Sequence, residues 1–155
     1  MREELYIGID PGQLGALAIL DSNGEVREVM LHDRFEYILL FDRLAKMDGL
    51  SPCAFVEHLN ARPPMQCSSK TNFSLGEDFG WTCGVLEALR LPYQLVRPAV
   101  WKKEFGCTSD KNTSIQTARR LFPSVDLRRT DRCKKDHDGK AEALLIAEWG
   151  RRHHG

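Results

Sequence analysis

The sequence predicts a single α/β domain over residues 1–155 with a mixed sheet, because short apolar runs alternate with longer segments of helical periodicity. Three apolar runs, 5–9, 16–20 and 26–31, are separated by Gly- and Asn-containing turns and predict an antiparallel meander. Two further strands are expected at 53–56 and 93–96, between the helical segments.

The helical segments differ in how clearly they are marked. Residues 35–47 carry apolar side chains at helical spacing and predict the first helix. Ser109 is a candidate N-cap for a helix that runs to about Leu121, before Pro123. The last helix is expected at about 140–149.

A long helix is expected over 72–91, and it carries Gly76, Gly80 and Gly84 on one face. Glycine costs a helix about 1 kcal/mol relative to alanine, so three on one face suggest close backbone packing. We expect that packing to be against another element of the same chain, and contact between two copies is the alternative.

Composition excludes several classes of protein. No apolar run approaches the roughly 20 residues of a membrane span, and the N-terminus resembles neither a secretory nor a transit segment. The five cysteines are odd in number and form no C-x-x-C pair, which indicates reduced thiols rather than disulfides or a zinc knuckle. We therefore expect a soluble protein in a cytosol-like compartment.

Charge is unevenly distributed although the formal net charge is zero. From Leu95 onward there are 14 Lys and Arg against 8 Asp and Glu, and the preceding part has the reverse, 8 against 14. This asymmetry favours a polyanion-binding surface in the C-terminal part, and an ordinary solvated face is the alternative.

Acidic residues stand where strands and helices can bring them together. Asp10 ends the first apolar run and Glu57 ends the fourth, so their carboxylates lie side by side if these strands are neighbours. Asp138 and Glu142 are four residues apart and share a face of the last helix. Converging carboxylates suit Mg²⁺ or Mn²⁺, and two such ions can promote phosphodiester hydrolysis.

Each acid also has an ordinary structural interpretation. Asp10 can form a turn before Pro-Gly, Asp138 can cap a helix, and Glu142 can lie exposed on one. Glu57 is harder to explain this way, because it closes the apolar run AFV and a buried lone carboxylate costs several kcal/mol. Taken together, the four acids and the basic C-terminal part favour a catalytic site.

Four segments of the chain, IGIDPG, FVEH, WKKEFGCTSDKNTSI and KKDHDGKAEALLIA, resemble the RuvC-type Holliday-junction resolvases of the RNase H-like superfamily. The similarity is greatest to the chloroplast branch and related phage proteins, and it covers nearly the whole chain in the same order. It implies one RNase H-like nuclease domain, with a mixed five-stranded sheet flanked by helices.

The resemblance also implies an activity and a site. Such proteins are homodimers that bind four-way DNA junctions and make paired symmetric nicks in recombination and repair, with two Mg²⁺ or Mn²⁺ ions. Asp10 is expected to bridge both ions, with Glu57 and Glu142 each completing one. Asp138 or His137 is expected to orient the nucleophile, and Asp136 is a third candidate for this position. The expected location is the cytoplasm or nucleoid in a bacterium or phage-infected cell, or an organelle for a trimmed chain.

Candidate DNA contacts lie in the basic C-terminal part and on the long helix. Lys102, Lys103 and Lys111 belong to the block that contacts the backbone near the cleaved phosphate in the family, and a solvated helix surface is the alternative. DNA-backbone contact is predicted for the more densely clustered Arg128, Arg129, Arg132, Lys134 and Lys135. Phe73 is a candidate for stacking on opened bases, whereas Phe79 and Trp81 are expected in the core.

Rival functions remain open at this point. D-x-G at Asp10 also occurs in actin-like and sugar-kinase ATPases, but those proteins enclose the nucleotide between two domains and this chain has room for one. Another RNase H-like nuclease, such as a ribonuclease, and a non-catalytic junction-binding protein are the remaining alternatives.

Overall fold

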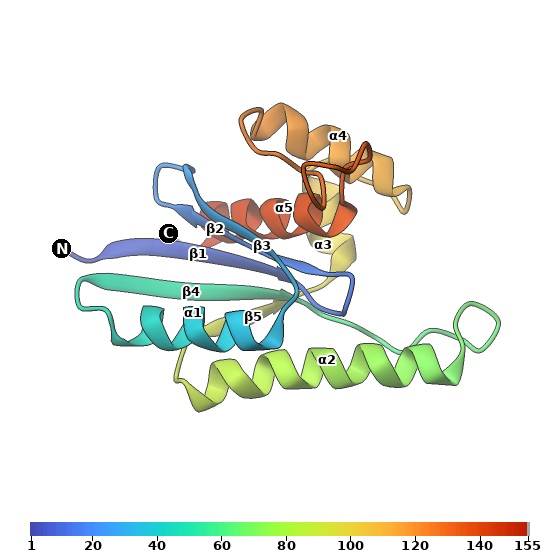
Figure 1. The fold of residues 1–155 in the computed structure, drawn as a ribbon, viewed down its shortest axis with the longest axis horizontal. Helices are drawn as coiled ribbons and strands as arrows, with labels where there is room; N and C mark the ends of the chain where they lie inside the picture. The colour runs from blue at the N-terminus through green and yellow to red at the C-terminus, as the bar shows by residue number, and fades with distance from the viewer. Residues whose placement is uncertain (155) are drawn as a thin grey trace.

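The computed structural model describes residues 1–154, which form a five-stranded mixed sheet with helices on both faces (Figure 1). The strand order is β3-β2-β1-β4-β5. The first three strands form the predicted antiparallel meander, and β4 and β5 run parallel to β1. The strands are β1 (Glu3–Asp10), β2 (Ala16–Asp21), β3 (Val26–Leu31), β4 (Leu50–Glu57) and β5 (Tyr93–Val96).

Within residues 1–154, five helices flank the sheet, and α4 packs on α5. Helices α1 and α2 lie on one face, and α5 lies on the other with α3 and α4 beside it (Figure 1). Each face has its own core, so the inner strands are apolar on both sides. Among the described residues, none of the helices is both long and apolar enough to cross a membrane. The helices are α1 (Arg34–Lys46), α2 (Ser69–Ala88), α3 (Pro98–Glu104), α4 (Lys111–Leu121) and α5 (Asp138–His153).

Strands β1 and β4 are neighbours, as the acidic site requires. Their parallel register pairs Ile9 with Val56, so the next residues, Asp10 and Glu57, stand at the same edge of the sheet. Parallel neighbours bring their carboxyl ends together, and this adjacency therefore places the two acids side by side.

Gly8 in the middle of β1 allows α5 to pack closely on the sheet. A Cβ at this position would lie 2.1 Å from the carbonyl oxygen of Ala143 and 2.4 Å from the amide nitrogen of Ala147. No other residue type fits this space without moving the backbone of α5. The close packing brings Glu142, the neighbour of Ala143, to the end of β1.

Several helices differ from the sequence-based expectation, including α5, which spans Asp138–His153 rather than about 140–149. Helix α4 is capped by Asp110 rather than Ser109, because the Asp110 carboxylate accepts a hydrogen bond from the Asn112 amide at 3.0 Å. The long helix begins at Ser69, after the N-cap Ser68, and ends at Ala88, before Arg90 adopts a φ of 58°. Helix α3 was not expected, since its seven residues are too few to show helical periodicity.

The glycine face of α2, Gly76, Gly80 and Gly84, does not pack against the rest of the described chain. All three glycines are exposed, and a Cβ at any of them would have no neighbour within 4 Å. The expectation of close packing within the chain is therefore wrong. Helix α2 instead turns its opposite side, with Asp78, Thr82 and Leu86, toward the sheet.

Candidate metal centre and basic surface

Three carboxylates meet where β1, β4 and α5 come together. Asp10, Glu57 and Glu142 each offer one oxygen, and these oxygens all lie within 4.8 Å of one another. Glu142 is 1% exposed and Glu57 is 7% exposed, so little water is available to solvate their charge. The group combines three of the four acids that the sequence had singled out.

The crowding of this three-carboxylate group shifts its protonation. Burial raises the pKa of Asp10 well above its usual range, and the nearby charges of Glu142 and Glu57 raise it further. Burial and Glu142 also raise the pKa of Glu57, against the lowering effect of a hydrogen bond from Trp101. Three carboxylates this close repel one another, and a small divalent cation that prefers oxygen ligands would relieve the repulsion. These residues therefore fit Mg²⁺ or Mn²⁺.

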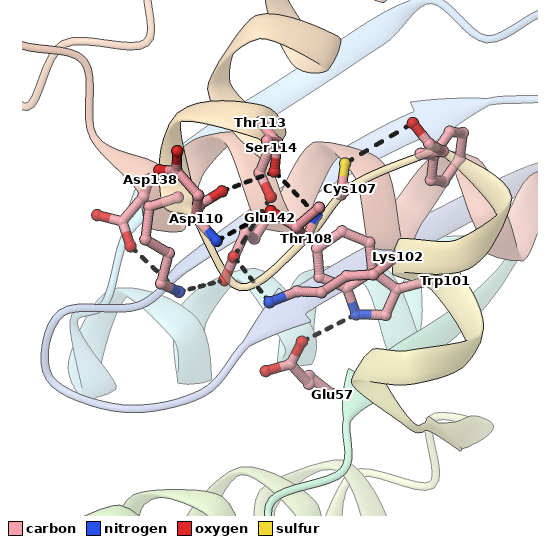
Figure 2. A network of polar contacts seen from close by, with 12 residues as sticks. Glu57, Trp101, Lys102, Cys107, Thr108, Asp110, Thr113, Ser114, Asp138 and Glu142 are labelled. Carbon is pink, nitrogen blue, oxygen red and sulfur yellow. Dashed lines mark hydrogen bonds and ion pairs between the residues drawn. The ribbon is translucent and has the colours of Figure 1, made fainter.

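Two lysines supply positive charge to Glu142. Lys111 Nζ lies 2.9 Å from Glu142 Oε2 and 3.3 Å from Asp138 Oδ2, and Lys102 Nζ lies 3.5 Å from Glu142 Oε1 (Figure 2). Although partial burial opposes the change, the charge and hydrogen bond of Glu142 raise the pKa of Lys111 above its usual range. Lys111 is therefore charged at neutral pH. Lys103, the third lysine of this set, is exposed.

The three candidates for the remaining acidic position have different surroundings. Asp138 opens α5, is 43% exposed at its side chain and shares Lys111 with Glu142. His137 is the N-cap of α5 and accepts a hydrogen bond from the Lys140 amide at 3.3 Å. Asp136 pairs with Arg119 of α4. Of the three, Asp138 alone shares a cation with the three-carboxylate group.

Trp101 is a site neighbour that the sequence reasoning missed. It lies on α3, is 0% exposed and donates a hydrogen bond from Nε1 to Glu57 Oε2 at 2.8 Å (Figure 2). Ser114 of α4 also approaches the site, with Oγ 3.5 Å from Glu142 Oε1. The one available signal was that Trp101 directly precedes two lysines in a block resembling the resolvases.

A basic surface borders the acidic group. Arg129, Arg132, Lys134 and Lys135 are exposed in the loop before α5. Arg128 differs, because its guanidinium holds both oxygens of Asp126 and the carbonyl of Asp131. A hollow of about 380 Å³ lies between this loop and α4, and its lining includes Lys111, Arg119, Lys134, Lys135 and Asp138.

The aromatic candidates on α2 separate as expected. Phe73 is 74% exposed, near the end of α2 that extends beyond the edge where β4 ends (Figure 1). Phe79 and Trp81 are partly buried and pack against the core between the sheet and α1. All five cysteines are free thiols.

Comparisons with known proteins give matches among solved structures. The structure of Thermus thermophilus RuvC in complex with a Holliday junction substrate matches at 15% identity, with 96% of this chain and 95% of that chain covered and a TM-score of 0.55. A second Thermus thermophilus RuvC structure matches at 17% identity, with 96% of each chain covered and a TM-score of 0.52. The chain has a RuvC-type fold.

The RuvC-type fold confirms the predicted fold class, a mixed five-stranded sheet with flanking helices. At these low identities the similarity shows the fold alone, so the chemistry of the site has to be argued from the residues of this chain. No protein-family model matches the sequence, and none of the curated proteins does.

Proposed function

We propose that this protein is a Holliday junction resolvase, a metal-dependent DNA endonuclease that makes paired symmetric nicks in four-way junctions. The observation that carries the proposal is the three-carboxylate group, Asp10, Glu57 and Glu142, with oxygens within 4.8 Å in a RuvC-type fold. We propose that residues 1–155 work as one nuclease domain in DNA recombination and repair, in the cytoplasm or at the nucleoid.

Asp10, Glu57 and Glu142 would hold Mg²⁺ or Mn²⁺, with Asp10 shared between two ions. When bound, such ions activate a water nucleophile and stabilise the leaving oxygen in phosphodiester hydrolysis. Asp138 would complete the set, because it already shares Lys111 with Glu142. His137 has a different role in this proposal: it caps α5 and so fixes the direction of the helix that carries Glu142.

Lys102 and Lys111 would change partners during the reaction. Without a bound cation they neutralise Glu142, at 3.5 Å and 2.9 Å. With Glu142 engaged in the metal centre, the two ammonium groups would be free to contact the DNA phosphate beside the site. Lys103, exposed on α3, would contact the neighbouring backbone.

The DNA arms would lie on the basic surface next to the acids. Phosphate contact is open to the exposed residues of the loop, Arg129, Arg132, Lys134 and Lys135, without the loss of a buried partner. Arg128 would first stabilise the loop through Asp126, and its contact with DNA would be secondary. Phe73, largely exposed, would stack on bases opened at the junction centre.

Symmetric nicking requires two active sites, and we propose a homodimer. The glycine face of α2 supports this part of the proposal, because a Cβ at any of its three glycines would meet no other part of the described protomer within 4 Å. A second copy packing there would explain why helix-weakening residues recur on one exposed face.

The test is a nicking assay on a synthetic four-way junction, a linear duplex of the same sequence and an RNA–DNA hybrid, each with Mg²⁺ and with EDTA. Paired cuts at symmetric positions on the junction alone, lost in EDTA, are the expected result. Cleavage of the hybrid would assign the protein to ribonucleases instead. Tight junction binding without cutting would leave a binding protein and contradict the proposed enzyme.

A further inference from the structure

We infer that Trp101 is a positioning residue for the metal centre, and that its indole N–H sets the orientation of the Glu57 carboxylate. This inference rests on the proposed function, in which Glu57 holds a divalent ion. Its core is one contact between two buried groups, the Nε1–H of Trp101 and Oε2 of Glu57, 2.8 Å apart.

The contact is specific because the Trp101 indole and the Glu57 carboxylate each have few other hydrogen-bond partners within reach. An indole N–H can only donate, and Trp101 is 0% exposed, so water does not compete for it. Glu57 is 7% exposed, and this is the only hydrogen bond that its carboxylate makes within residues 1–154. The single donor therefore engages Oε2 and leaves Oε1 as the oxygen available to a cation.

Helix α3 holds the indole in place independently of Glu57. At its C-terminal end, Glu104 pairs with Arg152 at 3.4 Å and with His153 at 2.6 Å, which ties α3 to α5. Within the helix, the Lys102 ammonium lies 5.2 Å from the centre of the Trp101 ring while it reaches toward Glu142. The donor is therefore held by α3 and by its packing in the core, and Figure 2 shows it directed at Glu57.

Two consecutive residues of one short helix therefore reach two of the three acids: Trp101 contacts Glu57, and Lys102 contacts Glu142. Hydrogen bonds from outside a metal's ligands orient those ligands, and their loss typically costs roughly 10- to 100-fold in metal affinity or activity. Trp101 is the residue placed to make such a bond to Glu57.

Trp101 also belongs to the core between the sheet and α5, so a variant can lose function by unfolding. Trp101→Phe removes the donor and keeps an aromatic ring. Trp149→Phe is the matched control, because Trp149 packs on Phe55 and His153 and, within residues 1–154, donates no hydrogen bond to the three carboxylates. A second variant carries benzothienylalanine at position 101, in which sulfur replaces the N–H and the bicyclic shape is kept.

The first measurement is Mn²⁺ affinity by calorimetry, made on the wild type and the three variants after each is shown to melt cooperatively. We expect Trp101→Phe and the benzothienylalanine variant to bind Mn²⁺ roughly 10- to 100-fold more weakly than the wild type. The Trp149→Phe variant should bind as the wild type does. The Mg²⁺ concentration needed for half-maximal nicking should rise in the same two variants.

The second measurement follows the three indole N–H resonances of the wild type by ¹H–¹⁵N NMR during a Mg²⁺ titration. The Trp101 resonance should shift as the site fills, and that of Trp149 should stay in place. Wild-type Mn²⁺ affinity in the benzothienylalanine variant would overturn the positioning role, even if Trp101→Phe were impaired through packing.

The outcomes separate this inference from the proposed function. If the wild type binds Mn²⁺ but does not cut junctions, the resolvase proposal fails, and the affinities of the variants still decide the role of Trp101. If the wild type binds no Mn²⁺, the metal centre and the positioning role fail together.

Discussion

Lys111 places its Nζ 2.9 Å from Oε2 of Glu142, which joins α4 to α5 by an ion pair on a buried carboxylate. The lysine side chain is 53% exposed and the glutamate side chain 1%. The Glu142 charge is costly to bury, whereas the Lys111 ammonium keeps its contact with water, and the pair compensates the charge of Glu142 when no cation is bound.

Replacing Lys111 with Met should destabilise the metal-free protein. Lys102, at the longer distance of 3.5 Å, would be the one cation left beside Glu142 among the described residues, so we expect the unfolding free energy to fall by about 1–2 kcal/mol in EDTA. Added Mg²⁺ should restore part of this loss, because an ion bound to Glu142 replaces the missing charge. Urea denaturation with and without Mg²⁺ measures both effects.

The matched control for this change is Lys46→Met on α1. Lys46 pairs with Asp42 at 2.8 Å, but both side chains are exposed, so its loss should cost less than about 0.5 kcal/mol and be insensitive to Mg²⁺. Equal losses in the two variants would contradict a special role for Lys111.

Asp10→Asn should separate junction binding from cutting. The substitution removes a proposed metal ligand but no phosphate contact, so junction affinity measured in Ca²⁺ or EDTA should be kept. The nicking rate should fall by more than about 100-fold, beyond the loss typical of residues that only orient ligands. Asp42→Asn, at a side chain of α1 that is 40% exposed and pairs with Lys46, should cut normally. Undiminished nicking by Asp10→Asn in Mg²⁺ would disprove the site.

Charge reversal at Arg129, Lys134 and Lys135 should weaken junction binding and flatten its salt dependence. Each lost phosphate contact should reduce the slope of log affinity against log salt by about 1. Reversal at Arg43 and Lys46, in the last turn of α1, is the control and should leave the slope unchanged. Fluorescence titrations over a range of salt concentrations give both slopes, and identical slopes would exclude this loop from the DNA surface.

A leucine at Gly80 should leave the protomer folded and shift the proposed dimer toward monomer. A Cβ at Gly80 would meet no other part of the described protomer within 4 Å, and the position is exposed, so the melting temperature of dilute protein should not fall. Lys70→Leu, also exposed on α2, is the control. Sedimentation equilibrium measures the dissociation constant, and an unchanged value would remove the glycine face from the interface.

The pH dependence of stability should include a contribution from Glu148. Burial opposes ionisation, but hydrogen bonds from Arg151 and Arg152 prevail and lower the pKa of Glu148 below its unfolded value of 4.5. A lowered folded-state pKa stabilises the protein above the unfolded pKa, and this contribution is lost as pH falls through the folded one.

Glu148→Gln tests this contribution directly. At neutral pH the variant should be about 1.5–3 kcal/mol less stable than the wild type, the range for hydrogen bonds to charged groups. The difference should shrink as pH falls below 4.5. Urea denaturation between neutral and acidic pH measures the stability difference at each pH. A difference between wild type and variant that grew on acidification would contradict the lowered pKa of Glu148.

The strands and two of the acids could be predicted from local sequence. Apolar runs bounded by turn residues predicted all five strands, and Asp10 and Glu57 stand at strand ends where the runs stop. Four motifs in order pointed to the RuvC-type fold, which the solved structures confirm. These features depend on neighbours along the chain, so periodicity and turn chemistry reveal them.

Other features were decided by tertiary structure. Asp138 and Glu142 share a helix face by spacing, yet Glu142 is buried and Asp138 is partly exposed. Asp138 is the first residue of α5, whereas Glu142 is the neighbour of Ala143, which packs closely on Gly8 of β1. Trp101 meets Glu57, 44 positions earlier, through a helix too short to show periodicity.

The exposure of the glycine face of α2 and the engagement of Arg128 with Asp126 were not predicted from the sequence. Spacing along an element tells which residues share a face. Which segment packs against that face depends on distant parts of the chain. The packing is decided by the burial energy of the whole core, which no local sequence pattern reveals.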